Sequence, residues 1–102
     1  MAVNVKAEHY PQLHAFLLGY LHEDFQFEYG TVLEARAVYL AQASFEERHE
    51  FADDCQRFLR VIDGVPVTAV REVLRRVFRC AWSPGNLVEV AAVLTPPVQR
   101  GD

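Results

Sequence analysis

Apolar residues follow a helical spacing near the start of the chain. From about Tyr10 to Leu21 they recur three or four positions apart, at Tyr10, Leu13, Phe16, Leu17, Tyr20 and Leu21. Pro11 lies near the first turn, where its missing N–H costs no hydrogen bond. The spacing predicts a core helix over residues 10–21. The next stretch, from His22 to Gly30, mixes acids with aromatics and ends in glycine, so we expect an exposed connecting segment there.

Two capping boxes predict where the next two helices begin. Thr31 with Glu34 opens a helix to about Gln42, and its apolar residues cover nearly every side, which is typical of a helix in the middle of a bundle. Ser44 with Glu47 opens the longest helix, which we expect to end near residue 62, before a glycine. Its apolar side carries Phe51, Ala52, Cys55, Phe58, Leu59 and Ile62.

The pattern in the last third of the chain predicts one helix and a second element that is either a helix or a strand. Thr68 is a plausible N-cap for a helix to about Cys80, with apolar residues inward and Arg75, Arg76 and Arg79 outward. A turn at residues 82–85 precedes a segment over 87–94 that asparagine and glutamate could cap as a helix. Because this segment contains three β-branched valines, a strand is the alternative for residues 87–94. The fold class we expect is all-α, a small antiparallel bundle of four to five helices.

Length and composition indicate one domain. The 102 residues, 51% of them hydrophobic, provide one core and no room for a second. We expect a single helical domain over residues 1–102, with flexible ends at about 1–8 and 95–102. The chain begins without the apolar stretch of a signal peptide, and no segment approaches the roughly 20 apolar residues of a membrane span. We therefore expect a cytoplasmic protein that does not bind membranes.

Charge is distributed unevenly along the chain. Residues 1–63 hold eleven acids and five bases, whereas residues 64–102 hold three acids and five bases. The net charge of −4 repels phosphate backbones and attracts basic partners. We therefore expect no nucleic acid as a partner, and interpret the three outward arginines as ordinary surface pairs. A basic protein is the favoured ligand.

Catalytic and metal-binding patterns are missing from the sequence. The histidines His9, His14, His22 and His49 form no HxxxH or HExxH pair. The two cysteines lack a CxxC spacing, and no GxSxG elbow or phosphate-binding loop occurs. The acidic pairs at 23–24, 46–47 and 53–54 would serve as acid and base only if they faced each other across a pocket. We expect no metal, no cofactor and no enzymatic activity.

The first helix and the acidic segment after it carry a family resemblance. The stretch from Tyr10 to Phe25 resembles the opening of contact-dependent growth inhibition immunity proteins, in which Tyr-Pro-x-Leu leads into Phe-Leu-x-x-Tyr and then a histidine and an aspartate before an aromatic. Tyr20, His22 and Asp24 match that motif, and the likeness extends over about residues 10–62. Phe25 stands where the family often has tryptophan.

The resemblance implies a cytoplasmic bacterial antidote that binds the toxic C-terminal domain of a cognate effector, often a nuclease, and is a monomer when free. A generic acidic helical adaptor is the alternative, with a small hydrolase as a third interpretation. Two acidic surfaces are candidates for the contact: Tyr20, His22, Glu23, Asp24, Phe25 and Glu28, with Phe27 and Tyr29 as further aromatic anchors, and Glu46, Glu50, Asp53 and Asp54 on the long helix. Equally, Tyr20, His22, Asp24 and Phe25 could form a packing and hydrogen-bonding cluster that fixes the turn.

Overall fold

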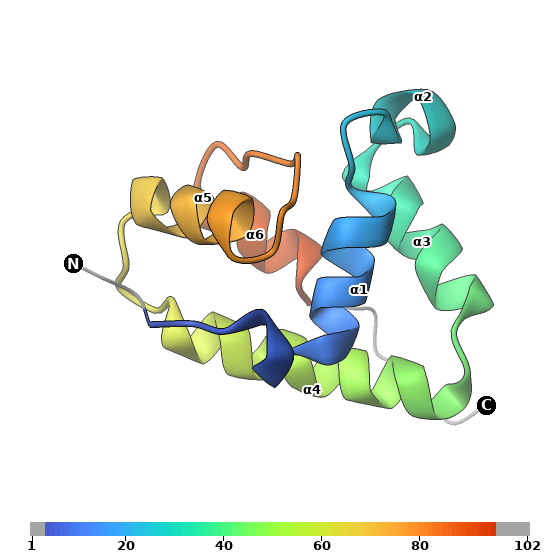
Figure 1. The fold of residues 1–102 in the computed structure, drawn as a ribbon, viewed down its shortest axis with the longest axis horizontal. Helices are drawn as coiled ribbons and strands as arrows, with labels where there is room; N and C mark the ends of the chain where they lie inside the picture. The colour runs from blue at the N-terminus through green and yellow to red at the C-terminus, as the bar shows by residue number, and fades with distance from the viewer. Residues whose placement is uncertain (1–3, 96–102) are drawn as a thin grey trace.

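Helices make up the regular structure throughout residues 4–95, the part of the chain that the computed structural model describes (Figure 1). In chain order they are η1 (Ala7–His9), α1 (Pro11–Tyr20), α2 (Phe25–Tyr29), α3 (Val32–Gln42), α4 (Phe45–Val61), α5 (Val67–Arg76) and α6 (Leu87–Val93). No strand occurs among these residues, which confirms the all-α class and resolves the last element as a helix. The helix α2 is additional to those that the sequence predicts.

The longest helix, α4, runs along one side of the molecule, and α1 packs against it (Figure 1). α1 also contacts α3, which in turn contacts α2 and α6. In Figure 1, α1 therefore stands in the centre, with α2 and α3 on one side and α5 and α6 on the other. The contact between α3 and α6 connects the two sides directly.

One hydrophobic core fills the space between the helices. The fully buried side chains of α1 and α4 meet there, with Phe16 and Phe51 ring centroids 5.5 Å apart in an edge-to-face arrangement. Tyr39 of α3 reaches the same place, 4.9 Å from the Phe51 ring. The predicted apolar sides of residues 10–21 and 44–62 are confirmed, because their largest members are buried: Leu13, Phe16, Leu17, Leu21, Phe51, Cys55, Phe58 and Ile62.

The start of α1 is capped by a side chain from α4. Its own N-cap residue, Tyr10, makes no side-chain cap. Instead Asp54, only 3% exposed, accepts hydrogen bonds at Oδ2 from the backbone N–H of Gln12 (2.9 Å) and of Leu13 (3.2 Å). Its other oxygen accepts from Arg57, which also donates to the His9 carbonyl oxygen at 3.0 Å. Both oxygens of the buried Asp54 carboxylate therefore accept hydrogen bonds.

The prediction that the helix after Thr31 lies in the middle of a bundle is wrong. In α3 only Ala35 and Tyr39 are buried, and Leu33 is 49% exposed. The helix lies at the edge of the molecule in Figure 1, where α1, α2 and α6 cover only part of its circumference. The apolar residues on all sides of α3 therefore do not indicate complete burial, because α1, α2 and α6 each cover a different part of the helix.

The helix α5 begins about two residues earlier than predicted and ends about four residues earlier. It begins at Val67 with Pro66 as N-cap residue, so the N-cap role of Thr68 is wrong. It ends at Arg76 and not near Cys80, because the chain turns back at Arg79, whose φ of 58° is left-handed. The N–H of Cys80 then donates to the Leu74 carbonyl oxygen at 3.0 Å, which closes the turn.

The expected flexible ends fall partly outside the described residues, which omit 1–3 and 96–102. Within the described part of the N-terminal end, Val5 is buried in the core, and η1 follows at Ala7–His9. The side chain of Val5 packs with the core cluster, and the flexibility of the two ends stays a prediction.

We expect Asp54→Ala to lower the free energy of unfolding by about 3 kcal/mol, because the substitution leaves two N–H groups and a guanidinium without their buried acceptor. Urea denaturation measures the change. The matched control is Asp53→Ala, which removes the exposed partner of the same arginine and should cost at most about 1 kcal/mol. Equal losses in the two variants would contradict the capping role of Asp54.

Arg79→Gly should raise the free energy of unfolding by about 1 kcal/mol, because glycine adopts the left-handed conformation without the steric cost that a Cβ carries. Thermal and urea unfolding of Arg79→Gly and Arg79→Ala separate this backbone effect from loss of the arginine side chain. A gain in both variants would show that the side chain, and not the backbone, is responsible.

Candidate functional site

The described residues bring together no recognisable catalytic or metal-binding group. Within residues 4–95, no three His, Cys, Asp or Glu side chains converge in a way that could hold a metal ion. The adjacent acids Asp53 and Asp54 share Arg57 as a partner, but the first is exposed on α4 and the second is buried against α1. This pair therefore does not face a shared pocket.

Both cysteines lie in the interior as free thiols. Cys55 is fully buried and Cys80 is 5% exposed. Burial raises the pKa of the Cys55 thiol far above its ordinary value, and it raises the pKa of Cys80 to about 12. Because the thiolate is the nucleophile, neither residue is poised for covalent catalysis.

Several candidate residues from the acidic segment build the corner between α1 and α2. The ring of Tyr20 stacks on Tyr29 at 5.6 Å, and its hydroxyl donates to the side-chain oxygen of Gln42. His22 accepts at Nδ1 from the N–H of Asp24 at 3.1 Å. Its Nε2 lies 3.3 Å from Oε1 of Glu28. The structure thus brings the family-like residues together in one hydrogen-bonded corner.

The sequence-based assignment of Phe25 to an exposed binding surface is wrong. Its side chain is 8% exposed and belongs to the core cluster, because the segment forms the short helix α2 and turns this residue inward. Tyr29 is half-buried in its stack with Tyr20. Of the three aromatics in this helix, only Phe27 faces solvent, and it is 95% exposed.

Phe27 and three acids close to it in sequence are exposed on α2 and just before it. We call Glu23, Asp24, Phe27 and Glu28 the α2 surface, since all four are exposed. Among the described residues, Glu23 and the Asp24 carboxylate make no ion pair, and Glu28 meets only His22. An exposed aromatic ring beside unpaired carboxylates is the combination typical of a protein-binding surface.

The acidic face of α4 is smaller than the sequence predicts. Glu46 and Glu50 are exposed, but Asp53 pairs with Arg57 at 2.9 Å, which reduces its effect on a partner. The assignment of Asp54 to this surface is wrong, because the residue is buried as the cap of α1. Phe45, 80% exposed at the start of α4, is an aromatic that the prediction missed, although it precedes the apolar side of that helix.

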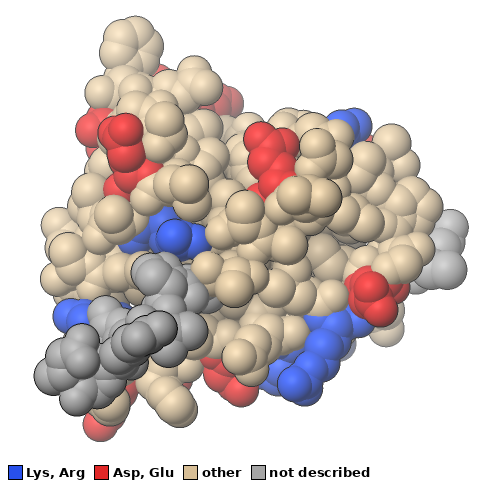
Figure 2. Space-filling model, turned by 180° about the vertical axis from the view of Figure 1, so that it is seen from behind, with Lys and Arg blue, Asp and Glu red and all other residues tan. Residues whose placement is uncertain are grey.

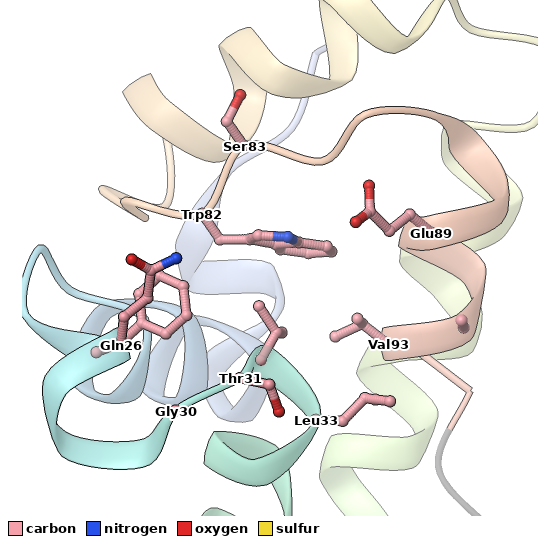
Figure 3. A pocket seen from close by; sticks show the side chains of 11 residues that line it. Gln26, Gly30, Thr31, Leu33, Trp82, Ser83, Glu89 and Val93 are labelled. Carbon is pink, nitrogen blue, oxygen red and sulfur yellow. The ribbon is translucent and has the colours of Figure 1, made fainter.

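An open groove of about 540 Å³ lies between the α2–α3 corner and the segment from Trp82 into α6 (Figure 3). Its lining combines polar and apolar surface in about equal parts, and Trp82 extends across it toward α6, where Glu89 and Val93 stand (Figure 3). Three separate parts of the chain contribute to the groove, so no local sequence signal could have revealed it. The lining residues are Phe25, Gln26, Gly30, Thr31, Val32, Leu33, Trp82, Ser83, Glu89, Ala92 and Val93.

The arginines serve mainly to join parts of the structure. Arg75 and Arg76 pair with Glu72 at 3.0 and 2.7 Å, which confirms the prediction of surface pairs for these two and lowers the pKa of the Glu72 carboxyl through hydrogen bonding. Arg36, half-buried on α3, donates to carbonyl oxygens at the end of α6, including that of Val93 at 2.9 Å. Arg71 donates to the Pro84 carbonyl oxygen at 2.6 Å and holds the loop before α6.

Charged side chains are dispersed over the face that Figure 2 shows, where acidic groups stand apart from one another among neutral atoms. The acidic excess of the sequence therefore does not form one continuous patch on this face. The local surroundings of each carboxylate, and not the net charge alone, decide which of them a partner can use.

Comparison with family models, curated proteins and solved structures gives no match for this chain. Among the described residues, no helix is both long enough and apolar enough to span a bilayer.

Both thiols should resist alkylation by iodoacetamide at pH 8 in the folded protein, because burial excludes the reagent and keeps the thiols protonated. Mass spectrometry of protein treated in buffer and in urea should show no adduct in the first sample and two in the second, matching the two cysteines. Rapid labelling of the folded protein would contradict the buried placement.

Proposed function

We propose that this protein acts by binding another protein, as an immunity protein that neutralises the toxic C-terminal domain of a contact-dependent growth inhibition effector. The resemblance over about residues 10–62 suggests this partner, and the exposed carboxylates favour a basic one, such as a nuclease domain. In this proposal the protein has no catalytic activity, and it blocks the toxin by covering its surface.

The observation that carries the proposal is the exposure of Phe27 among acids. A phenylalanine that is 95% exposed contributes nothing to the core, whereas a partner with a matching apolar pocket can bury it. Glu23 and Asp24 precede it by a few residues and Glu28 follows it directly, and all three are exposed. Together they provide an apolar anchor with a negative rim.

The α2 surface is a better candidate than the acidic face of α4. On α4, one of the four predicted acids is buried and another is neutralised by Arg57. On each surface two carboxylates are without an ion pair among residues 4–95: Glu23 and Asp24 beside α2, and Glu46 and Glu50 on α4. The exposed ring on α2, Phe27, is 95% exposed, more than Phe45 at 80%, so it has more apolar surface for a partner to bury. Unpaired charges at the rim accelerate the encounter with an oppositely charged partner and disfavour acidic ones.

The contacts of His22 with Asp24 and Glu28 help the α2 surface to keep its shape. The N–H of Asp24 and the carboxylate of Glu28 are both joined to this one imidazole, and Phe25 anchors the helix in the core. A five-residue helix has little stability of its own. These contacts therefore preorganise the surface, so that less ordering is required on binding.

Phe27→Ala should weaken binding to the toxin domain about 30-fold, because it removes the apolar anchor. The test co-expresses the protein with the C-terminal domain of a large effector encoded beside it, and measures survival, co-purification and affinity by calorimetry. The wild-type chain should protect the cells and form a stable complex. The thermal midpoint of Phe27→Ala should equal that of the wild type, since the side chain is solvent-exposed.

Phe45→Ala is the matched control, since it removes the same side chain from an exposed position on α4. Its affinity should stay within about twofold of the wild type. If Phe45→Ala loses binding and Phe27→Ala keeps it, the contact lies on α4 and the α2 surface is excluded. If the wild-type chain neither protects cells nor binds the domain, the immunity function itself is refuted.

A further inference from the structure

The groove beside α2 has an apolar body that Val32, Leu33 and Val93 help to line. Its volume of about 540 Å³ suits one or two amino-acid side chains better than a whole helix, which is roughly 10–12 Å across. Leu33 is 49% exposed at its edge, so part of the apolar lining is open to solvent in the free protein. Because polar and apolar surface line it in about equal parts, the space suits an elongated side chain with an apolar stem and a polar end.

Trp82 presents an unused hydrogen-bond donor in this groove. The side chain is 8% exposed, yet its Nε1 has no acceptor among residues 4–95. No side-chain nitrogen or oxygen in the described structure is both fully buried and unpaired, so this N–H is reached by solvent through the groove. The backbone of Trp82 is fixed by the Cys80 thiol, to which its N–H donates at 3.3 Å. The indole is thus a rigid donor that lacks a protein partner.

Glu89 supplies the one charge among the described residues that line the groove. Its Oε2 accepts from the N–H of Gly85, and its own N–H donates to Asn86 Oδ1 at 2.8 Å. These bonds hold the side chain in place, and its Oε1 has no donor within the described part of the chain. In Figure 3 the carboxylate points toward Trp82, on the same side as the indole nitrogen.

A lysine or arginine residue of a protein partner satisfies all three features. Its aliphatic stem would lie along the apolar wall and the indole face, its cation would pair with Glu89, and its own main-chain carbonyl would accept from Nε1 of Trp82. An anionic group would be repelled by Glu89, and a purely apolar one would desolvate both polar atoms without compensation. We infer that this groove is the subsite for a basic side chain of the partner. The inference rests on the proposed function for the identity of that partner.

Trp82 is the single tryptophan of the chain, so its indole reports directly on the groove. The probe is the capped tripeptide Leu-Arg-Leu, and the control peptide carries neutral citrulline in place of arginine. Titration is followed by indole fluorescence and by the one indole N–H cross-peak in a ¹⁵N correlation spectrum. The arginine peptide should shift this peak saturably in the millimolar range, and the citrulline peptide should bind about tenfold more weakly.

Glu89→Gln tests the charge without removing the cap, because the amide oxygen can still accept from Gly85. This variant should bind the arginine peptide about tenfold more weakly, whereas Glu72→Gln, which removes an acid on α5, should bind it like the wild type. Absence of a saturable indole shift, or equal binding of the two peptides, would overturn the subsite. The titration needs no toxin, so success there with failed protection in co-expression would refute the immunity function alone.

Discussion

The buried carboxylate of Asp54 is the constraint on which the rest of the fold depends. Burial of a charge is unfavourable unless polar partners replace the water that it loses. Here the start of α1 and the guanidinium of Arg57 provide those partners, and the ring of Tyr10 lies 4.8 Å from that guanidinium. The interaction sets both the position and the direction of α1 on α4. Because α1 also contacts α3, this single carboxylate orients the central element of the molecule.

Local signals predicted the long helices well, because the caps and the apolar sides of α1 and α4 are encoded within each segment. The predicted box at Thr31 is only half formed, since Thr31 Oγ1 accepts from the N–H of Glu34 but no return bond from the Glu34 side chain is made. In the structure Ser44 and Glu47 satisfy each other's N–H groups, as the box predicts. The five-residue helix α2 escaped notice because it is too short for a periodic pattern. The same limit explains why Phe25 was placed on the surface.

The role of Asp54 and the groove depend on neighbours that are distant in sequence. Asp54 lies three positions after Phe51 and four before Phe58, at the border of the buried side, so the helical pattern alone could have cast doubt on its exposure. Its partners at the start of α1 are 41 and 42 residues away, and no local pattern identifies them. Likewise, a turn containing tryptophan does not show which helices will enclose the ring.

The two proposed contacts belong to one end of the molecule. Phe25 and Gln26 of α2 line the groove, and Phe27, the next residue, forms the anchor of the α2 surface. A partner that buries the exposed phenylalanine is therefore close enough to place a basic side chain beside Trp82. The acidic rim would govern the rate of encounter, and the groove would add selectivity for a particular side chain.

The long sequence separations within the fold also bear on how the chain acquires its structure during translation. When α1 leaves the ribosome, the carboxylate that completes its first turn has yet to be synthesised, since it lies about 40 residues downstream. The hydrogen bond of Leu21, just after α1, can form only later still, because its carbonyl oxygen accepts from the N–H of Ala81 at 2.8 Å. Nascent α1 therefore has unsatisfied N–H groups and an uncovered apolar side, and the native arrangement forms only when most of the polypeptide has emerged.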